Sequence, residues 1–172
     1  MYDLESITFR RPTLEDGMDV YRLVENCSPL DTNSSYCNLL QCSHFSDTSI
    51  AAEIDGKLAG FVSGYILPAR PNTLFIWQVA VAEQARGLGL ASRMLTNLLA
   101  RDQSTSNSTP IEYLETTITQ DNKPSWALFE GLAKKQSVAL NTSDWMDKEA
   151  HFSGQHDSET LVRLGPFPLT SK

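Results

Sequence analysis

A short stretch in the middle of the chain has the residue types and spacing to hold a phosphate group. Gln84 is followed by Arg86, Gly87 and Gly89, and an amphipathic segment begins directly after them. The first turn of a helix leaves backbone N–H groups without partners and carries a partial positive charge, so it attracts anions. Glycines let the backbone approach the anion closely, and an arginine can add a charge-assisted hydrogen bond. The stretch therefore predicts a turn that cradles the phosphates of a ligand.

Two other glycine-rich signatures fit this turn less well. A Walker loop needs Gly-Lys-Ser or Gly-Lys-Thr before its helix, and the sequence contains neither. A dinucleotide fingerprint would need a third small residue at Ser92 and would follow the first strand of its unit, whereas this turn follows the fourth expected strand. A strand-to-helix turn without any ligand is the remaining alternative, and the context favours it less.

The elements that must position this turn are indicated by the hydrophobic pattern. Residues 74–81 are nearly all apolar, which is typical of a central strand covered on both faces. Residues 89–100 carry leucines and a methionine at helical spacing. A proline-containing loop at 68–72 is expected to precede the strand.

Upstream of the strand, the pattern predicts a first strand, two helices and a hairpin. The strand covers residues 7–10, and a helix follows with Thr13 as its N-cap and Asp16 in a capping-box position. The second helix lies between Ser34 and Phe45, with Cys37, Leu39, Leu40 and Phe45 as its apolar positions. Asp55-Gly56 is the turn of a hairpin formed by residues 49–54 and 57–66.

Downstream of the turn, the pattern predicts a polar loop at 104–109, a strand at 111–118 and a helix that begins near Pro124. Two further strands, at 138–140 and 160–164, are separated by a long polar segment that is a candidate functional loop. The element order is β-α-α-β-β-β-α-β-α-β-β. This order predicts a mixed α/β sheet with helices on both faces.

Composition narrows the classes of function. The chain has 172 residues, which suits a single domain spanning 1–172, and a net charge of −7, which disfavours a nucleic-acid partner. No apolar run is long enough to span a membrane and no secretory signal is visible, so we expect a cytoplasmic protein. The three cysteines lack metal-ligand spacing, and buried free thiols are expected rather than disulfides or a zinc site.

The motif Gln84-x-x-Gly87-x-Gly89 resembles the acetyl-coenzyme A pyrophosphate loop of the GCN5-related N-acetyltransferase (GNAT) family. The resemblance implies a GNAT fold, with a mixed, mostly antiparallel sheet of about six to seven strands. It implies acetyl-coenzyme A as co-substrate, without a metal, and a homodimer. A second motif, Asn122-x-x-Ser125-x-x-x-Phe129, resembles the family's other coenzyme-binding segment. The implied coenzyme contacts are Val79 and Val81 along the pantetheine arm, Arg86, Gly87, Leu88, Gly89, Leu90 and Ala91 around the pyrophosphate, and Asn122, Ser125 and Phe129.

Further segments resemble a branch of this family whose members acetylate the γ-amine of L-2,4-diaminobutyrate, a step in ectoine synthesis. These segments are residues 29–36, 44–45, 77–79, 114–117 and 151–159. The resemblance implies that the chain is an acyltransferase with a small diamino acid as its substrate. An acetyltransferase for another small diamine or a polyamine, and a non-catalytic coenzyme sensor, are the alternatives.

Diaminobutyrate carries two ammonium groups, a carboxylate and a short methylene chain, and each needs a different kind of partner. Asp31 and Glu115 are the expected acceptors for the ammonium groups. Asn33, Tyr36 and Thr116 are the expected polar partners, and Trp77 and Trp145 are the expected wall of the site. The structural alternatives are a helix cap for Asp31, a solvated strand pair for Glu115 and a core position for Trp77.

The polar segment adds His156 and Glu159 to the expected substrate-binding residues. Together with His151 and Asp157 they could be considered as metal ligands, but no further ligand spacing supports a metal. A loop that closes over the substrate is the preferred interpretation.

The expected reaction is direct attack of a neutral amine on the thioester, with a backbone N–H near Val79 stabilising the oxyanion. Glu115, Asp31 and Tyr36 are the candidate catalytic residues. The pKa of a carboxylic acid, about 4.3, and that of an alkylammonium, about 10.4, differ by roughly 6 units or about 8 kcal/mol. Glu115 would therefore need help from desolvation of the amine or from a water molecule. Many relatives carry a tyrosine where Phe129 stands, so the acid for the departing thiolate is Tyr36, water or none.

Overall fold

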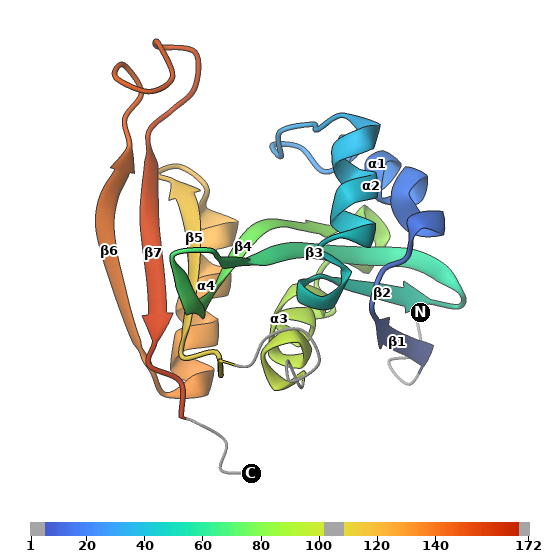
Figure 1. The fold of residues 1–172 in the computed structure, drawn as a ribbon. Helices are drawn as coiled ribbons and strands as arrows, with labels where there is room; N and C mark the ends of the chain where they lie inside the picture. The colour runs from blue at the N-terminus through green and yellow to red at the C-terminus, as the bar shows by residue number, and fades with distance from the viewer. Residues whose placement is uncertain (1–5, 102–108, 169–172) are drawn as a thin grey trace. The chain divides into compact units, whose positions relative to one another are not determined.

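The computed structural model describes residues 6–101 and 109–168 (Figure 1). The chain divides into two compact units. The first unit comprises Met1–Tyr65 and Ile76–Ser108, and the second comprises Ile66–Phe75 and Thr109–Lys172. No helix among the described residues is long and apolar enough to cross a membrane.

The strands form one seven-stranded sheet in the order β1-β2-β3-β4-β5-β7-β6. The pairs β1–β2, β2–β3, β5–β7 and β6–β7 are antiparallel, and the pair β4–β5 is parallel. The strands are β1 (Ile7–Arg10), β2 (Ile50–Ile54), β3 (Lys57–Leu67), β4 (Arg70–Val81), β5 (Tyr113–Thr119), β6 (Ala139–Met146) and β7 (Glu159–Gly165). The predicted order of elements and the mixed, mostly antiparallel sheet are confirmed.

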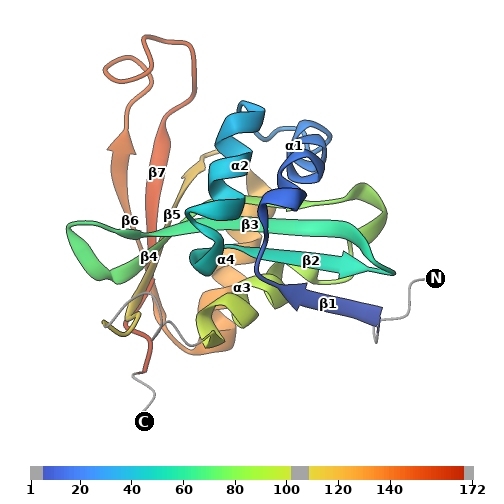
Figure 2. The ribbon, with the colours of Figure 1, turned by 45° about the vertical axis from the view of Figure 1, so that its right-hand side comes forward.

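Helices cover both faces of the sheet in the first unit. In Figures 1 and 2, α1 (Gly17–Glu25) and α2 (Ser35–Ser43) lie on one side of β2 and β3, and α3 (Leu90–Ala100) lies on the other. The core between these layers is apolar and fully buried, and its largest members are Ile50, Phe61, Ile76, Leu90, Met94, Leu95 and Leu98. The expected apolar stripe of α1, Val20, Leu23 and Val24, is buried.

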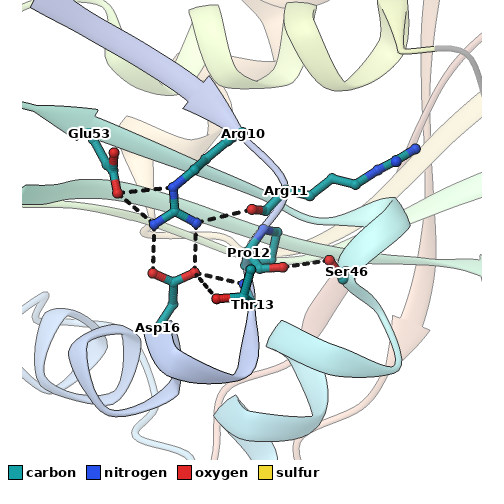
Figure 3. Close-up of polar contacts among 7 residues, drawn as sticks. All are labelled: Arg10, Arg11, Pro12, Thr13, Asp16, Ser46 and Glu53. Carbon is teal, nitrogen blue, oxygen red and sulfur yellow. Dashed lines mark hydrogen bonds and ion pairs between the residues drawn. The ribbon is translucent and has the colours of Figure 1, made fainter. Parts of the chain in front are cut away.

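A charged cluster joins β1, β2 and the start of α1 (Figure 3). The predicted capping box forms, with a hydrogen bond of 2.7 Å from the backbone N–H of Thr13 to the Asp16 carboxylate, but it caps a 3-10 turn (Leu14–Asp16) that leads into α1. Arg10 donates to both oxygens of Asp16 at 2.7 Å, and its Nε donates to Glu53 at 3.0 Å. One guanidinium therefore ties a neighbouring strand and a helix start to β1.

The buried face of α2 differs from the predicted one. Its fully buried residues are Asn38, Gln41 and Cys42, whereas Cys37, Leu39, Leu40 and Phe45 are only half-buried. Asn38 donates to Gln41 at 3.0 Å, and this single bond joins two polar side chains inside the unit. A hydrophobic pattern alone does not reveal such a pair. The expectation that all thiols are buried is likewise wrong for Cys37.

Strand β4 also corrects the prediction. It begins at Arg70, so that only a two-residue turn remains of the proline-containing loop expected at 68–72. It is not covered on both faces: Ile76, Gln78 and Ala80 are buried, while Val79 and Val81 are half-buried and Trp77 is 41% exposed. One face of the strand therefore remains accessible to a ligand.

In the second unit, β5 pairs with β7 and α4 (Lys123–Gln136) lies beside it. The segment between the last two strands is shorter than expected. β6 extends to Met146 because its polar residues pair with β7 along the whole edge, and the connection covers only 147–158. The polar loop expected at 104–109 lies, apart from Thr109, outside the described residues.

We expect Asp16→Asn to lower the free energy of unfolding by about 2 kcal/mol at neutral pH, because it removes charge-assisted bonds to Arg10. The hydrogen bonds from Arg10 lower the pKa of Asp16 below its usual value of 3.8. A carboxyl group with a depressed folded-state pKa contributes stability above its unfolded pKa and loses it as the pH falls through the folded value. The difference between wild type and variant should therefore shrink below about pH 4 in urea titrations.

Asp19→Asn is the matched control, because Asp19 forms an exposed ion pair with Arg22 on the same helix. It should change stability by less than about 0.5 kcal/mol. Equal effects of the two substitutions would contradict the structural role of the Arg10 cluster.

Candidate functional site

The predicted turn lies between β4 and α3 in the first unit. Gly87 and Gly89 have φ angles of +81° and +67°, and Gly89 is the N-cap of α3. Among the described residues, no atom beyond the adjacent positions lies within 4 Å of where a Cβ would stand at either glycine, so the backbone conformation and not packing requires glycine. Arg86, Gly87 and Gly89 are exposed, and Leu90 anchors the helix in the core. The turn thus presents a helix start of the kind that binds phosphate.

The end of β4 is fixed by two contacts that hold the turn in place. The backbone N–H of Ala82 donates to the carbonyl of Ala59 at 2.8 Å. The Cys27 thiol donates to the carbonyl of Val81 at 3.3 Å.

Burial raises the pKa of the other buried thiol, Cys42, to about 12, so this thiol has little nucleophilic character.

Gln78 organises the loop that carries two expected substrate residues. Its side chain donates to the carbonyl of Asp31 at 2.9 Å and accepts from the side chain of Asn33 at 2.7 Å. Its own backbone N–H donates to Ser63 Oγ at 3.1 Å. Gln78 is not among the residues that the sequence predicts for the site, although a glutamine inside an apolar strand is a signal that could have identified it.

Aromatic side chains line the accessible face of β4. Trp77 meets Tyr65 edge to face, with ring centroids 6.2 Å apart, and Tyr65 packs against Phe45 at 5.9 Å. Trp77 is 41% exposed and Tyr36 is 69% exposed. The exposure of Trp77 fits a wall of a binding site better than a core position.

The second coenzyme motif begins α4 in the second unit. Asn122 is the N-cap and accepts a hydrogen bond of 3.2 Å from the backbone N–H of Ser125. Phe129 is 2% exposed and belongs to the core of its unit. The motif thus builds a capped helix start at Asn122, and the position where many relatives carry a tyrosine holds a buried ring without a hydroxyl.

The geometry corrects the expectation that Glu115 accepts the amine of a substrate. Its side chain is 2% exposed, and both oxygens already accept hydrogen bonds from arginines. Arg70 donates from two nitrogens at 2.6 and 2.8 Å, and Arg163 donates from one at 2.6 Å. The solvated strand pair considered as an alternative is also wrong, because the carboxylate is buried. Neither arginine is among the residues that the sequence predicts for the site.

Thr116 cannot share a pocket with Glu115. Successive side chains of a strand point to opposite faces, so the two residues lie on opposite sides of β5. Thr116 is 4% exposed. Its contact with the substrate stays a prediction.

The connection between β6 and β7 is held by its own hydrogen bonds. Asp147 accepts from the backbone N–H groups of two following residues, and its own N–H donates to His151 at 2.7 Å. The rings of His156 and Phe152 are tilted by 39°, with centroids 4.6 Å apart, and His156 Nε2 lies 3.9 Å from Glu159 Oε1. Trp145, in β6, is 51% exposed. Among residues 6–101 and 109–168, no group of three His, Cys, Asp or Glu side chains is placed to hold a metal ion.

The chain is similar in sequence to proteins of one activity. It is 56% identical over 164 residues to L-2,4-diaminobutyric acid acetyltransferase of Methylotuvimicrobium alcaliphilum, covering 95% of this chain and 93% of that relative. It is 50% identical over 163 residues to the protein of the same name from Vibrio cholerae, covering 95% and 90%.

A solved structure extends the similarity to the whole fold. Diaminobutyrate acetyltransferase EctA from Paenibacillus lautus, in complex with its substrate L-2,4-diaminobutyric acid and coenzyme A, matches with a TM-score of 0.88 and 34% identity over 100% of both chains. A family model described as the Acetyltransferase (GNAT) family matches residues 12–133, which include the glycine turn and the start of α4. The protein therefore belongs to the GNAT family of acetyltransferases.

Proposed function

We propose that this protein transfers an acetyl group from acetyl-coenzyme A to the γ-amine of L-2,4-diaminobutyrate, giving N-γ-acetyl-2,4-diaminobutyrate, a step of ectoine synthesis. The observation that carries the proposal is the exposed Gly87–Gly89 turn at the start of α3, in a chain whose relatives over 95% of its length are diaminobutyrate acetyltransferases. The relatives indicate which amine is the substrate, and the turn provides the backbone N–H groups that bind the coenzyme.

The coenzyme is held by backbone more than by side chains. The N–H groups at the start of α3, from Gly87 to Ala91, bind the pyrophosphate, and the exposed Arg86 adds a charge-assisted contact. Val79 and Val81 on the accessible face of β4 pair with the pantetheine arm. Asn122 and Ser125 contribute from the capped start of α4, while Phe129 supports that helix from the core.

Substrate recognition in the first unit depends on the loop that Gln78 holds. Asp31 accepts a hydrogen bond from an ammonium group, with Asn33 and Tyr36 as neutral partners. Trp77 contacts the methylene chain and attracts the cation through its ring face. In the second unit, Glu159 and His156 add polar contacts from the start of β7, and Trp145 adds an exposed aromatic surface.

In the chemical step, the neutral γ-amine attacks the thioester carbonyl, a C–N bond forms, and the C–S bond breaks as the thiolate departs. The amine loses its proton to Asp31 directly or through water, after desolvation has lowered its pKa. A backbone N–H of β4 near Val79 stabilises the oxyanion. Tyr36 or water protonates the thiolate, since Phe129 has no hydroxyl.

The assembly that we propose is a homodimer of one 172-residue catalytic domain, acting in the cytoplasm, where acetyl-coenzyme A is available. Strand β6 supports the dimer: it pairs with β7 along one edge, and six of its eight residues, starting at Asn141, are exposed without interruption. An exposed strand of this kind at the edge of a sheet is a surface that proteins commonly cover.

The first test follows thiol release from acetyl-coenzyme A with diaminobutyrate, diaminopropionate, ornithine, lysine and spermidine. We expect diaminobutyrate to give the highest kcat/KM and NMR to locate the new acetyl group on the γ-nitrogen. A preference for another amine would leave the coenzyme assignment unchanged and would replace diaminobutyrate as the assigned substrate. Tight coenzyme binding without turnover of any amine would indicate a sensor.

Gly87→Asp should raise the Kd of acetyl-coenzyme A by about tenfold or more, because its carboxylate would face the pyrophosphate. Gly87→Asn is the matched control, since asparagine has the same size, lacks the charge and tolerates a positive φ. We expect the asparagine variant to stay within about threefold of wild type in calorimetric titrations. Equal affinity for all three proteins would exclude the turn as the pyrophosphate site.

Asp31→Asn should lower kcat/KM for diaminobutyrate by about 10- to 100-fold while the Kd of acetyl-coenzyme A stays unchanged, because a charge-assisted bond to the substrate is lost. Asp55→Asn, in the hairpin turn of β2 and β3, is the control and should behave as wild type. Full activity of the Asp31 variant would remove this residue from the substrate site.

A further inference from the structure

Two arginines share a single buried carboxylate in the second unit. We call Arg70, Glu115 and Arg163 the arginine clamp. Glu115 is almost completely buried, while the side chains of Arg70 and Arg163 are 42% and 30% exposed. The two guanidinium groups outnumber the one carboxylate, so the clamp is a positively charged group in a chain whose net charge is −7.

The clamp is rigid because each arginine is fixed by more than one contact. Arg70 forms a bidentate pair with the two oxygens of Glu115. The guanidinium of Arg163 donates to Glu115 and lies over the ring of Tyr113, 3.8 Å from its centroid. Stacking and the hydrogen bond together fix the plane of this guanidinium.

The absence of a side chain at Gly165 makes room for this arrangement. A Cβ at Gly165 would lie 2.7 Å from a ring carbon of Tyr113 and 2.6 Å from the carbonyl oxygen of Glu112. The Tyr113 ring therefore lies against the backbone of β7, and the ring also contacts the guanidinium of Arg163.

Most of the N–H donors of the clamp are not used by Glu115. Arg70 gives it two N–H groups and Arg163 gives it one, and each guanidinium has further donors in the same plane. Planar, partly exposed donors with excess positive charge are suited to bind a carboxylate.

The clamp and Glu159 lie on the same face of the sheet. Arg163 and Glu159 are separated by four positions of β7, so their side chains point to one side, with Cα atoms roughly 13 Å apart. Glu115 pairs with Arg163 in register and shares this face. A positive group and a carboxylate on one face of the sheet offer partners of opposite charge to an amino acid with a second amine on its side chain.

We propose that Arg70 and Arg163 bind the α-carboxylate of the amine substrate, and that Glu115 is a positioning residue that holds both guanidiniums in place. This inference rests on the proposed function and adds the feature that selects an amino acid over a simple diamine. It assigns the hydrogen-bond donors that the carboxylate of diaminobutyrate requires. It also replaces the expectation that Glu115 accepts a hydrogen bond from the amine.

The test compares L-2,4-diaminobutyrate with 1,3-diaminopropane, which is the same molecule without its carboxylate. In Arg163→Gln and Arg70→Gln, we expect the KM for diaminobutyrate to rise by about 10- to 100-fold, because a charge-assisted bond to the carboxylate is lost. The kcat for diaminobutyrate, the KM for acetyl-coenzyme A and the kcat/KM for 1,3-diaminopropane should change by less than about threefold. If 1,3-diaminopropane reacts too slowly, its inhibition constant against diaminobutyrate gives the same comparison.

Arg22→Gln is the control, because Arg22 is exposed on α1 and forms an ion pair with Asp19 of the same helix. It should leave every constant unchanged. Glu115→Gln should raise the KM for diaminobutyrate as the arginine variants do, and it should lower thermal stability, because two guanidiniums then face each other without a carboxylate.

Equal losses with both amines in the arginine variants would overturn the proposal and make the clamp a structural device. An unchanged KM for diaminobutyrate in both variants would overturn it as well. These outcomes leave the proposed function intact as long as the wild type acetylates diaminobutyrate. A wild type that binds acetyl-coenzyme A and acetylates no amino acid would instead overturn the proposed function.

Discussion

The carboxylate of Glu115 is the interaction on which the second unit depends most. It accepts hydrogen bonds from residues of two other strands, so one side chain joins β4, β5 and β7. Removing a partner from a buried ion pair costs about 3–5 kcal/mol, because the remaining charge is left uncompensated. The same interaction fixes which arginine nitrogens remain available at the surface. Under the proposed binding of the substrate carboxylate, stability and recognition in this unit have a common origin.

The first unit uses the opposite arrangement of charges. There one guanidinium, that of Arg10, binds the carboxylates of Asp16 and Glu53 and so joins β1 to β2 and to the start of α1. The surplus charge is negative in the Arg10 cluster and positive in the arginine clamp. A substrate with two ammonium groups and one carboxylate needs both negatively and positively charged partners. In the Arg10 cluster, however, Asp16 and Glu53 are already engaged in pairs with Arg10.

The ligand-binding features share a second constraint, which is that backbone groups must be presented while the core stays closed. β4 meets it by burying one face and leaving Trp77 and Val79 accessible on the other. The turn after β4 satisfies the same constraint with two glycines of positive φ, followed by a helix whose first residue is buried. Gln78 connects these features to the loop of Asp31, because it is buried and polar and holds that loop by two side-chain hydrogen bonds.

Local patterns by themselves determined the order of elements, the capping box of Thr13 and Asp16, and the glycine turn, because caps, turns and amphipathic periods depend on neighbours in the chain. Only the tertiary structure decided which polar residues are buried and what they contact. Glu115 has the same local sequence whether it faces solvent or two arginines, and those arginines are 45 and 48 positions away. The extension of β6 to Met146 likewise depends on pairing with β7, since its polar residues carry no strand pattern of their own. Pairing between distant segments sets burial and charge partners, and that is why the sequence predicted the glycine turn while only the tertiary structure showed that two arginines engage Glu115.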